Sequence, residues 1–416
     1  MPADDGPLID GLRRDLRQED GPPRSTRAWD VAVVGAGPAG STLAAHLASR
    51  GRHVLLLDRD RFPREKVCGD GLIPDALAAL GRLGLAEEVA AAGYRSTRVT
   101  IWSPSRLAVD IPGTFVTLKR LVLDALIARA AVRRGAAFTH GRVVALDCRE
   151  PGEVRLRLAG LESPVHARVA VVATGADQSL CLPRPGLATD SGPTGIALRR
   201  YVRSRARIDG LQVSFDRRVL PGYAWIFPLG DGEYNIGCGT FQRDRTAQRV
   251  DLRRTFERFT SGFPPAAELM AQSEWAAPLR GGRLRCSLAW LPLAANDRVV
   301  AIGETIGATF PFTGEGIGKA METAEIAAEL IDEALDRDCP TELRRLGQEV
   351  HRRLKPRYEG YERAEAWMSR PWAADLIAGL ARWRPGVRSA AAGILDETVD
   401  PRAVFSWRGL AATLLR

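Results

Sequence analysis

The segment at residues 29–60, WDVAVVGAGPAGSTLAAHLASRGRHVLLLDRD, constrains the fold more than any other part of the chain. It predicts a β-branched strand, a glycine turn, a helix rich in alanine and leucine, and a second strand, which together form one βαβ unit. Gly35, Gly37 and Gly40 fit the pattern G-x-G-x-x-G, and Asp58 follows at the end of the second strand. The pattern alone is weak, but in this context it indicates a dinucleotide-binding site in a Rossmann-like α/β fold.

Each residue type in this segment has a physical reason. The first glycine permits a tight turn, the second lets the backbone approach a pyrophosphate, and the third allows close packing of helix on strand. The helix N-terminus adds partial positive charge. Asp58 would bind the ribose hydroxyls and would disfavour a 2′-phosphate, so NADP is not expected at this site. The alternative interpretation of the segment is a glycine turn that binds no ligand. The cofactor-binding candidates of this unit are Gly35, Gly37, Ala39, Gly40, Asp58 and Arg59.

Composition excludes several classes of protein. With 45% apolar and 26% charged residues over 416 positions, the chain has the make-up of a globular protein with two or three lobes. The formal charge is +9, but only four of the 59 basic residues are lysines. This arginine bias reflects GC-rich coding more than a selected anion-binding surface, so we expect no nucleic-acid partner. We also expect no metal, because the six cysteines and five histidines lack ligand spacing.

Neither a signal peptide nor an apolar run of about 18 residues is visible, so we expect a cytoplasmic protein or one attached peripherally to the inner face of the membrane. Basic residues cluster in TELRRLGQEVHRRLKPR, residues 341–357, which is either an ordinary solvated helix face or a surface for anionic lipid.

Strand and helix patterns divide the chain into a Rossmann-like FAD-binding domain, an inserted antiparallel β-sheet that binds substrate, and a C-terminal helical region. The predicted bounds are residues 1–27 for a flexible tail, 28–95, 118–180 and 283–336 for the FAD-binding domain, 96–117 and 181–282 for the sheet domain, and 337–416 for the helical region.

A second glycine-rich segment favours FAD over a nicotinamide cofactor. In VVAIGETIGATFPFTGEGIGKAMETAEIAAEL, residues 299–330, a buried strand ends at Gly303 and Glu304, and glycines then lead into another helix N-terminus. Such a terminus, aimed at the pyrimidine edge of a flavin, would stabilise negative charge on the reduced ring. A nicotinamide dehydrogenase has no need of this second site. The cofactor-binding candidates here are Gly303, Glu304, Pro311, Gly314, Gly316 and Ile317.

Four motifs, GAGPAG, PREKVCGDGL, PGYAWIFPLGDGEYNIG and PFTGEGI, follow one another between residues 29 and 335. With them the chain resembles the geranylgeranyl reductase family of flavoproteins, within the wider group typified by p-hydroxybenzoate hydroxylase, and is similar to menaquinone side-chain reductases. The resemblance implies an FAD-dependent oxidoreductase that transfers hydride from reduced flavin to a carbon–carbon double bond of an isoprenoid or other hydrophobic polyene. Without a second dinucleotide fingerprint, the electron donor is expected to be external, either NAD(P)H or a reduced carrier protein.

The resemblance also implies roles for individual residues. Arg120 matches a flavin-contacting arginine, and the backbone near Val143 and Val144 would border the adenine. Cys68 and Gly69 match an element beside the flavin ring, where Cys68 would donate a proton or tune the flavin. The alternative for Cys68 is a small buried side chain in a turn.

Tyr223, Trp225 and Phe227 alternate in YAWIFP and therefore share one face of a strand. By resemblance this face lines the substrate cavity, where burial at roughly 0.8 kcal/mol per CH₂ would hold a prenyl chain. An aromatic core stripe is the alternative. Cys68, Tyr223 and Trp225 are the catalytic candidates.

The chain departs from the family pattern twice, at Glu304, where aspartate is usual, and at Gln178, where glycine is frequent. The main rival function is an FAD monooxygenase or halogenase of the same fold. A third possibility is a protein that keeps FAD as a scaffold without redox turnover.

Overall fold

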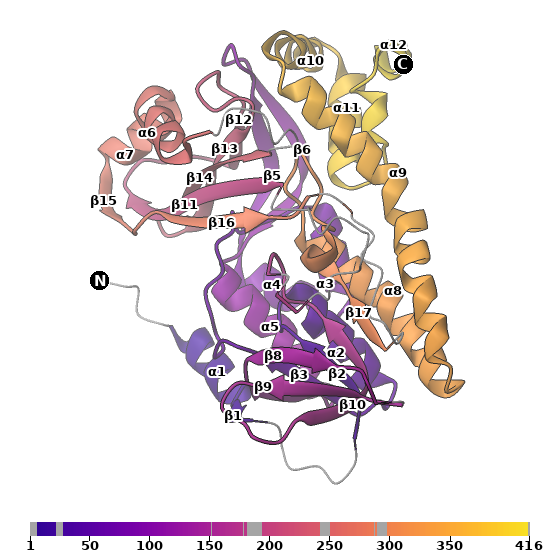
Figure 1. Ribbon diagram of the computed structural model, residues 1–416. Helices are drawn as coiled ribbons and strands as arrows, with labels where there is room; N and C mark the ends of the chain where they lie inside the picture. Colours follow the sequence, from indigo (N-terminus) through magenta and orange to yellow (C-terminus); the bar gives the residue numbers. More distant parts are fainter. Residues whose placement is uncertain are drawn as a thin grey trace.

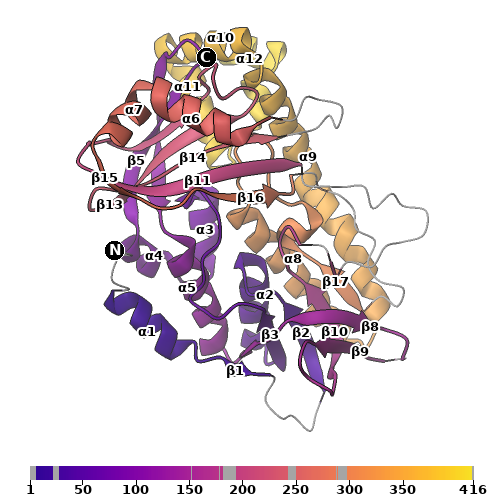
Figure 2. The same cartoon turned by 60° about the vertical axis from the view of Figure 1, so that its left-hand side comes forward.

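The computed structural model describes residues 6–21, 28–150, 152–177, 179–180, 194–241, 250–286, 288 and 298–414. Two β-sheets and the helices around them make up this part of the chain (Figures 1 and 2). The fold class predicted from the sequence, a Rossmann-like domain with an inserted sheet and a C-terminal helical region, is confirmed.

The first sheet has eight strands in the order β1-β7-β3-β2-β10-β9-β8, with β17 beside β10. The pairs among β1, β7, β3, β2, β10 and β17 are parallel, whereas β8 and β9 pair antiparallel. Helix α2 packs against α5 and α8 beside this sheet. The bounds are β1 Glu19–Asp20, β2 Trp29–Val34, β3 Val54–Asp58, β7 Ala137–His140, β8 Val143–Asp147, β9 Val154–Leu158, β10 Val165–Val172, β17 Val299–Ala301, α2 Pro38–Ser49, α5 Arg120–Arg133 and α8 Ile317–Asp336.

The second sheet has nine strands in the order β15-β11-β14-β13-β12-β5-β6-β4, with β16 beside β11. Its pairs are antiparallel except for β12 and β5, which run parallel. The sequence predicts an antiparallel sheet, and this pair is the exception. β5 and β12 are not joined to each other by a hairpin turn, so their relative direction is not fixed as antiparallel. The bounds are β4 Gly71–Leu72, β5 Tyr94–Trp102, β6 Ala108–Thr117, β11 Gly195–Ser204, β12 Leu211–Ser214, β13 Tyr223–Gly230, β14 Glu233–Phe241, β15 Ser273–Ala276 and β16 Arg280–Leu284.

Helices cover the second sheet on both faces. α6 and α7 pack on one face through a core that includes Ile226 and Phe259. The C-terminal helices pack over β5, β6 and β12 through a separate core. The helical bounds are α3 Pro74–Arg82, α4 Ala86–Ala92, α6 Leu252–Gly262, α7 Pro264–Ala271, η1 Gly303–Ile306, η2 Pro340–Arg344, α9 Arg345–Met368, α10 Pro371–Trp383, α11 Pro385–Leu395, η3 Pro401–Ala403 and α12 Trp407–Leu414. None of the helices in the described part of the chain has the length and apolar character needed to cross a membrane.

The N-terminal region differs from the expected flexible tail. Residues 7–15 form helix α1, and β1 then pairs with β7. Leu12 in this helix and Leu16 directly after it are both buried, while Asp15 pairs with Arg129 of α5 at 3.3 Å. The mixed charges around these leucines hid a short amphipathic pattern, so the expectation is wrong for this stretch. Residues 1–5 and 22–27 lie outside the described part.

Candidate active site

A cavity of about 450 Å³ lies where the two sheets face each other. One end is formed by the carboxyl ends of β2, β3 and β10 and by the N-termini of α2 and α8, which is where open α/β sheets bind ligands. The other end is apolar and includes Val99, Ile101, Leu211, Phe215 and Leu395. The cavity therefore joins a polar half suited to a dinucleotide with an apolar half suited to a hydrophobic substrate.

The glycine turn after β2 is tightly packed. Gly35 has φ +104, and a Cβ there would lie 2.4 Å from the carbonyl oxygen of Ala173. A Cβ on Gly40 would lie 1.9 Å from the carbonyl oxygen of Gly35, so this glycine serves helix–strand packing as expected. Asp58 accepts a hydrogen bond from the amide of Ala36 at 2.8 Å. Asp58 therefore stabilises the glycine turn and also lines the cavity next to that turn.

Hydrogen bonds tie the Cys68 loop to the second sheet. Asn235 on β14 donates through Nδ2 to the carbonyl oxygen of Cys68 and to the carboxylate of Asp70, both at 2.8 Å. The same Asn235 accepts a bond from Trp225 Nε1 at 2.9 Å, and Tyr201 donates to Asp70 at 2.8 Å. Burial raises the pKa of Asp70, against the lowering effect of these donors. The loop is therefore held by groups from three strands that lie far away in sequence.

The aromatic residues of β13 lie against the glycines of this loop. A Cβ on Gly69 would be 3.5 Å from the rings of both Trp225 and Phe227, and one on Gly71 would be 3.0 Å from Phe227. Tyr223, Trp225 and Phe227 all line the cavity, whereas the intervening Ala224 and Ile226 enter the opposite core. The predicted shared face is confirmed, and Tyr223 also donates to the carbonyl oxygen of Thr313 at 2.9 Å.

A buried cluster of charges lies under the loop. Arg120, at the start of α5, pairs with Asp124 at 2.6 Å, and Arg64 pairs with the same carboxylate at 3.0 Å. Burial lowers the pKa of Arg120, but Asp124 and the neighbouring Cys68 raise it more, so the net shift is upward. The Arg120 guanidinium thus keeps its positive charge beside the loop.

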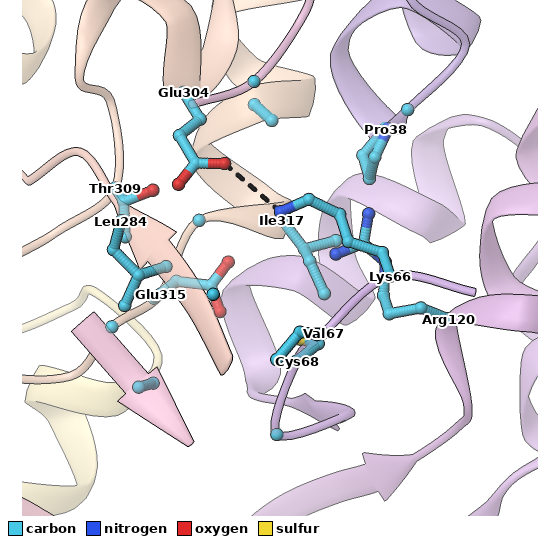
Figure 3. Close-up of a pocket in the computed structure, with 18 of the residues that line it drawn as sticks. Pro38, Lys66, Val67, Cys68, Arg120, Leu284, Glu304, Thr309, Glu315 and Ile317 are labelled. Atoms are coloured by element: carbon cyan, nitrogen blue, oxygen red, sulfur yellow. Dashed lines mark hydrogen bonds and ion pairs between the residues drawn. The ribbon is translucent and has the colours of Figure 1, made fainter. Parts of the chain in front are cut away.

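The opposite wall comes from η1 and the start of α8 (Figure 3). Glu304 pairs with Lys66 at 3.3 Å, which links this wall to the Cys68 loop. Glu315 accepts a hydrogen bond from the amide of Gly318 at 2.5 Å, and burial raises its pKa to about 8. Because this carboxyl is mostly protonated at neutral pH, it does not cancel the positive end of α8.

The cavity brings together most residues that the sequence singled out. Lining residues are Gly35, Gly37, Ala39, Asp58, Arg59, Cys68, Gly69, Arg120, Tyr223, Trp225, Phe227, Glu304, Gly314, Gly316 and Ile317. Gly40, Gly303, Pro311 and Val144 do not line it, and Gln178 lies outside the described residues. Gly303 packs instead against the side chain of Ala39.

Val143 lines the cavity, whereas the side chain of Val144 is 46% exposed. The expected contact of the backbone at these two residues with the adenine stays a prediction. Successive strand residues point to opposite faces, so only one of the pair can face a ligand with its side chain.

The sequence reasoning missed several residues of this site. Asp70 and Glu315 lie within motifs that had been recognised, so a buried carboxyl in each was a detectable signal. Asn235 also lies within a recognised motif, but its bonds to the Cys68 loop span more than 160 residues, and Tyr201, whose partner Asp70 is 131 residues away, gave no signal. Phe312 lines the cavity with φ +72, a backbone conformation that nothing in its sequence neighbourhood indicates.

Comparison with known proteins agrees with this geometry. Residues 28–189 match the family model described as FAD binding domain. The chain is 34% identical to menaquinone reductase of Mycobacterium tuberculosis over 73% of its own length and 76% of the relative. It is 28% identical to digeranylgeranylglycerophospholipid reductase 2 of Methanopyrus kandleri, over 74% and 78%.

Solved structures show the same fold. A geranylgeranyl bacteriochlorophyll reductase-like protein of Thermoplasma acidophilum superposes with a TM-score of 0.74 at 20% identity, covering 94% of this chain and 96% of that one. The flavin-dependent brominase Bmp2 gives 0.72 at 19%, covering 93% and 97%.

The fold and the matched domain define an FAD-dependent oxidoreductase. Within that class, the chain belongs to the geranylgeranyl reductase family of flavoproteins. The family expected from the four motifs is thereby confirmed.

Proposed function

We propose that the protein reduces a carbon–carbon double bond in the prenyl chain of an isoprenoid lipid. The observation that carries the proposal is the 34% identity to a menaquinone reductase over 73% of the chain. The cavity supports it, because an apolar half adjoins the half that suits a dinucleotide. The brominase is less than 25% identical to this chain, so the comparison shows a shared fold and does not favour halogenation.

The residues present fit FAD. The Gly35 turn has no room for a side chain, which leaves its backbone free to approach a pyrophosphate. The positive end of α8 faces the cavity, and Glu315 beside it is mostly protonated at neutral pH and does not oppose that charge. Asp58 and Val143 would hold the adenosine end, and Gly69 would lie beside the ring.

Bound FAD, once reduced by an external donor such as NAD(P)H or a reduced carrier protein, would supply the hydride for the double bond. Cys68 would provide the proton for the neighbouring carbon, and Arg120 keeps positive charge next to this thiol. Trp225 would act through Asn235 by fixing the loop, while Tyr223 and Phe227 would wall the substrate. The apolar half would hold the chain by excluding water, at about 0.8 kcal/mol per CH₂ buried.

The test is anaerobic turnover. Protein loaded with FAD and reduced with dithionite is incubated with prenylated quinones and geranylgeranyl lipids, and products are read by mass. We expect a gain of two hydrogens per bond reduced, with Cys68→Ala strongly impaired and Cys68→Ser less so. Turnover that requires oxygen would refute the reductase proposal, and full activity in both variants would remove Cys68 from the chemistry.

Because the proposed substrate resides in membranes, we also propose that the protein works in the cytoplasm at the inner face of the membrane. A route from the bilayer to the apolar half of the cavity is then required, and the C-terminal helices cover that half.

A further inference from the structure

Helix α10 has an inverted distribution of side chains. Its buried positions carry mainly alanines, namely Ala373, Ala374, Ala378 and Ala381 together with Ile377. Three of its five large apolar residues point outward, with Trp372 54% exposed, Leu376 37% and Trp383 79%, whereas Ile377 and Leu380 pack on the core. The spacings of four and eleven residues put these three side chains on one stripe of the helix. An amphipathic helix packed on a core shows the reverse arrangement, so packing does not explain this stripe.

Tryptophans of two other helices extend the stripe. Trp407 of α12, which is 61% exposed, stacks on Trp372 with ring centroids 6.2 Å apart, and Trp367 of α9, which is partly buried against the core, meets Trp407 edge-on at 4.9 Å. We name these five side chains, Trp367, Trp372, Leu376, Trp383 and Trp407, the α10 patch. Contiguous exposed apolar surface marks an interaction site in soluble proteins.

The charges around the α10 patch are positive. Residues 366–395, all described, contain four arginines and one acid, Asp375; the acids that follow directly are Asp396 and Glu397, and Glu397 pairs with Lys319 and Arg357. The carboxylate of Asp375 already accepts hydrogen bonds from the hydroxyls of Ser103 and Ser105, both at 2.7 Å. Two copies of the chain meeting through this patch would bring arginines together, which is unfavourable. An anionic lipid surface complements both the arginines and the tryptophans, which favour the membrane–water interface.

The α10 patch also lies on the outer side of the helices that cover the apolar half of the cavity. α10 and α11 both pack on β6 (Figure 1). Their buried residues share one core with Val99 and Leu211. Those two strand residues line the cavity, as does Leu395 at the end of α11. Binding of the α10 patch to a bilayer would therefore place the apolar half of the cavity close to the lipid.

The basic segment at residues 341–357 is a weaker candidate for that surface. Arg352 and Arg353 both pair with Glu349, at 2.5 and 2.6 Å, so much of their charge is compensated within α9. That segment also exposes no tryptophan.

We propose that the α10 patch, with the arginines around it, docks the protein on the surface of an anionic lipid bilayer. The inference deepens the proposed function, on which it rests for the origin of the substrate, by naming the face that meets the membrane.

Vesicle flotation tests the docking proposal without substrate or turnover. The docking proposal can therefore fail while the reductase proposal holds, and the reductase proposal can fail while the docking proposal holds. Full-length protein is mixed with vesicles of phosphatidylcholine, with or without phosphatidylglycerol. We expect binding only when phosphatidylglycerol is present, and a loss of at least about tenfold in the double variant Trp372→Gln/Trp383→Gln. Trp275→Gln, which changes another exposed tryptophan on β15, is the matched control and should bind as the unmodified protein does.

The charge contribution is tested by Arg382→Gln/Arg384→Gln against the matched pair Arg352→Gln/Arg353→Gln on α9. We expect the first pair to weaken binding several-fold and the second to leave it nearly unchanged. Absence of vesicle binding, equal loss in the control variants, or unchanged binding in the tryptophan double variant would overturn the proposal. A change of oligomeric state in that variant, without vesicle binding, would identify a second copy of the chain as the occupant.

Discussion

Asn235 offers the sharpest test of how the Cys68 loop is held. Replacing it with alanine removes three hydrogen bonds, those to Trp225 Nε1, to the carbonyl oxygen of Cys68 and to the carboxylate of Asp70. Each buried group left without a partner costs about 1–3 kcal/mol, but Asp70 keeps its bond from Tyr201. We therefore expect Asn235→Ala to lower the free energy of unfolding by about 3–5 kcal/mol.

The assay is urea unfolding followed by circular dichroism, with hydrogen exchange of the amides at residues 66–71 as a local readout. Gln212→Ala is the matched control, because Gln212 also accepts from a tryptophan, Trp102, at 2.7 Å, and donates to the carbonyl oxygen of Asp209, just before β12, at 2.9 Å. Both variants should lose stability, but only Asn235→Ala should speed exchange in the loop. A loss below about 1 kcal/mol, or equal loop exchange in the two variants, would refute the argument.

Two further predictions concern buried groups around the cavity. Burial raises the pKa of Glu315 from 4.5 to about 8, so the folded state holds this proton more tightly than the unfolded chain does. Stability should therefore fall by up to about 1.4 kcal/mol per pH unit as pH rises through that window, and Glu315→Gln should remove this slope, measured as urea unfolding at a series of pH values. An identical pH profile in both proteins would contradict the buried carboxyl. A Cβ on Gly237 would lie 2.3 Å from the Trp225 ring, so Gly237→Ala should cost about 1–3 kcal/mol and change tryptophan fluorescence, whereas Gly379→Ala, where nothing lies within 4 Å, should not be destabilising.

Sequence reasoning succeeded where the signal is local. The glycine turn, the strand before it and Asp58 belong to one continuous segment, and the structure places the end of that strand, Gly35, Gly37 and Asp58 at the cavity. The alternation of Tyr223, Trp225 and Phe227 was equally readable, because a strand has a period of two. Motif order supplied the rest, since four short matches across the chain specify a family.

Long-range partners could not be predicted in this way. The bond between Asn235 and Cys68 joins residues 167 positions apart, and the pair Lys66–Glu304 spans 238. Helix α1 was missed because its buried Leu12, like Leu16 directly after the helix, sits among charged residues. Helix α10 would be read as an ordinary packed helix, since only the structure shows that three of its large residues face outward.

Protection of Cys68 by the cofactor tests the central claim, that flavin binds between the Cys68 loop and the start of α8. The folded protein, with and without FAD, is treated briefly with iodoacetamide, and alkylation is measured cysteine by cysteine by mass spectrometry. Cys339, which follows α8 and is not among the cavity-lining residues, serves as the internal reference. We predict that FAD slows alkylation of Cys68 by at least about tenfold while leaving Cys339 unchanged. Equal alkylation of Cys68 in the two states, with FAD demonstrably bound, would contradict the account.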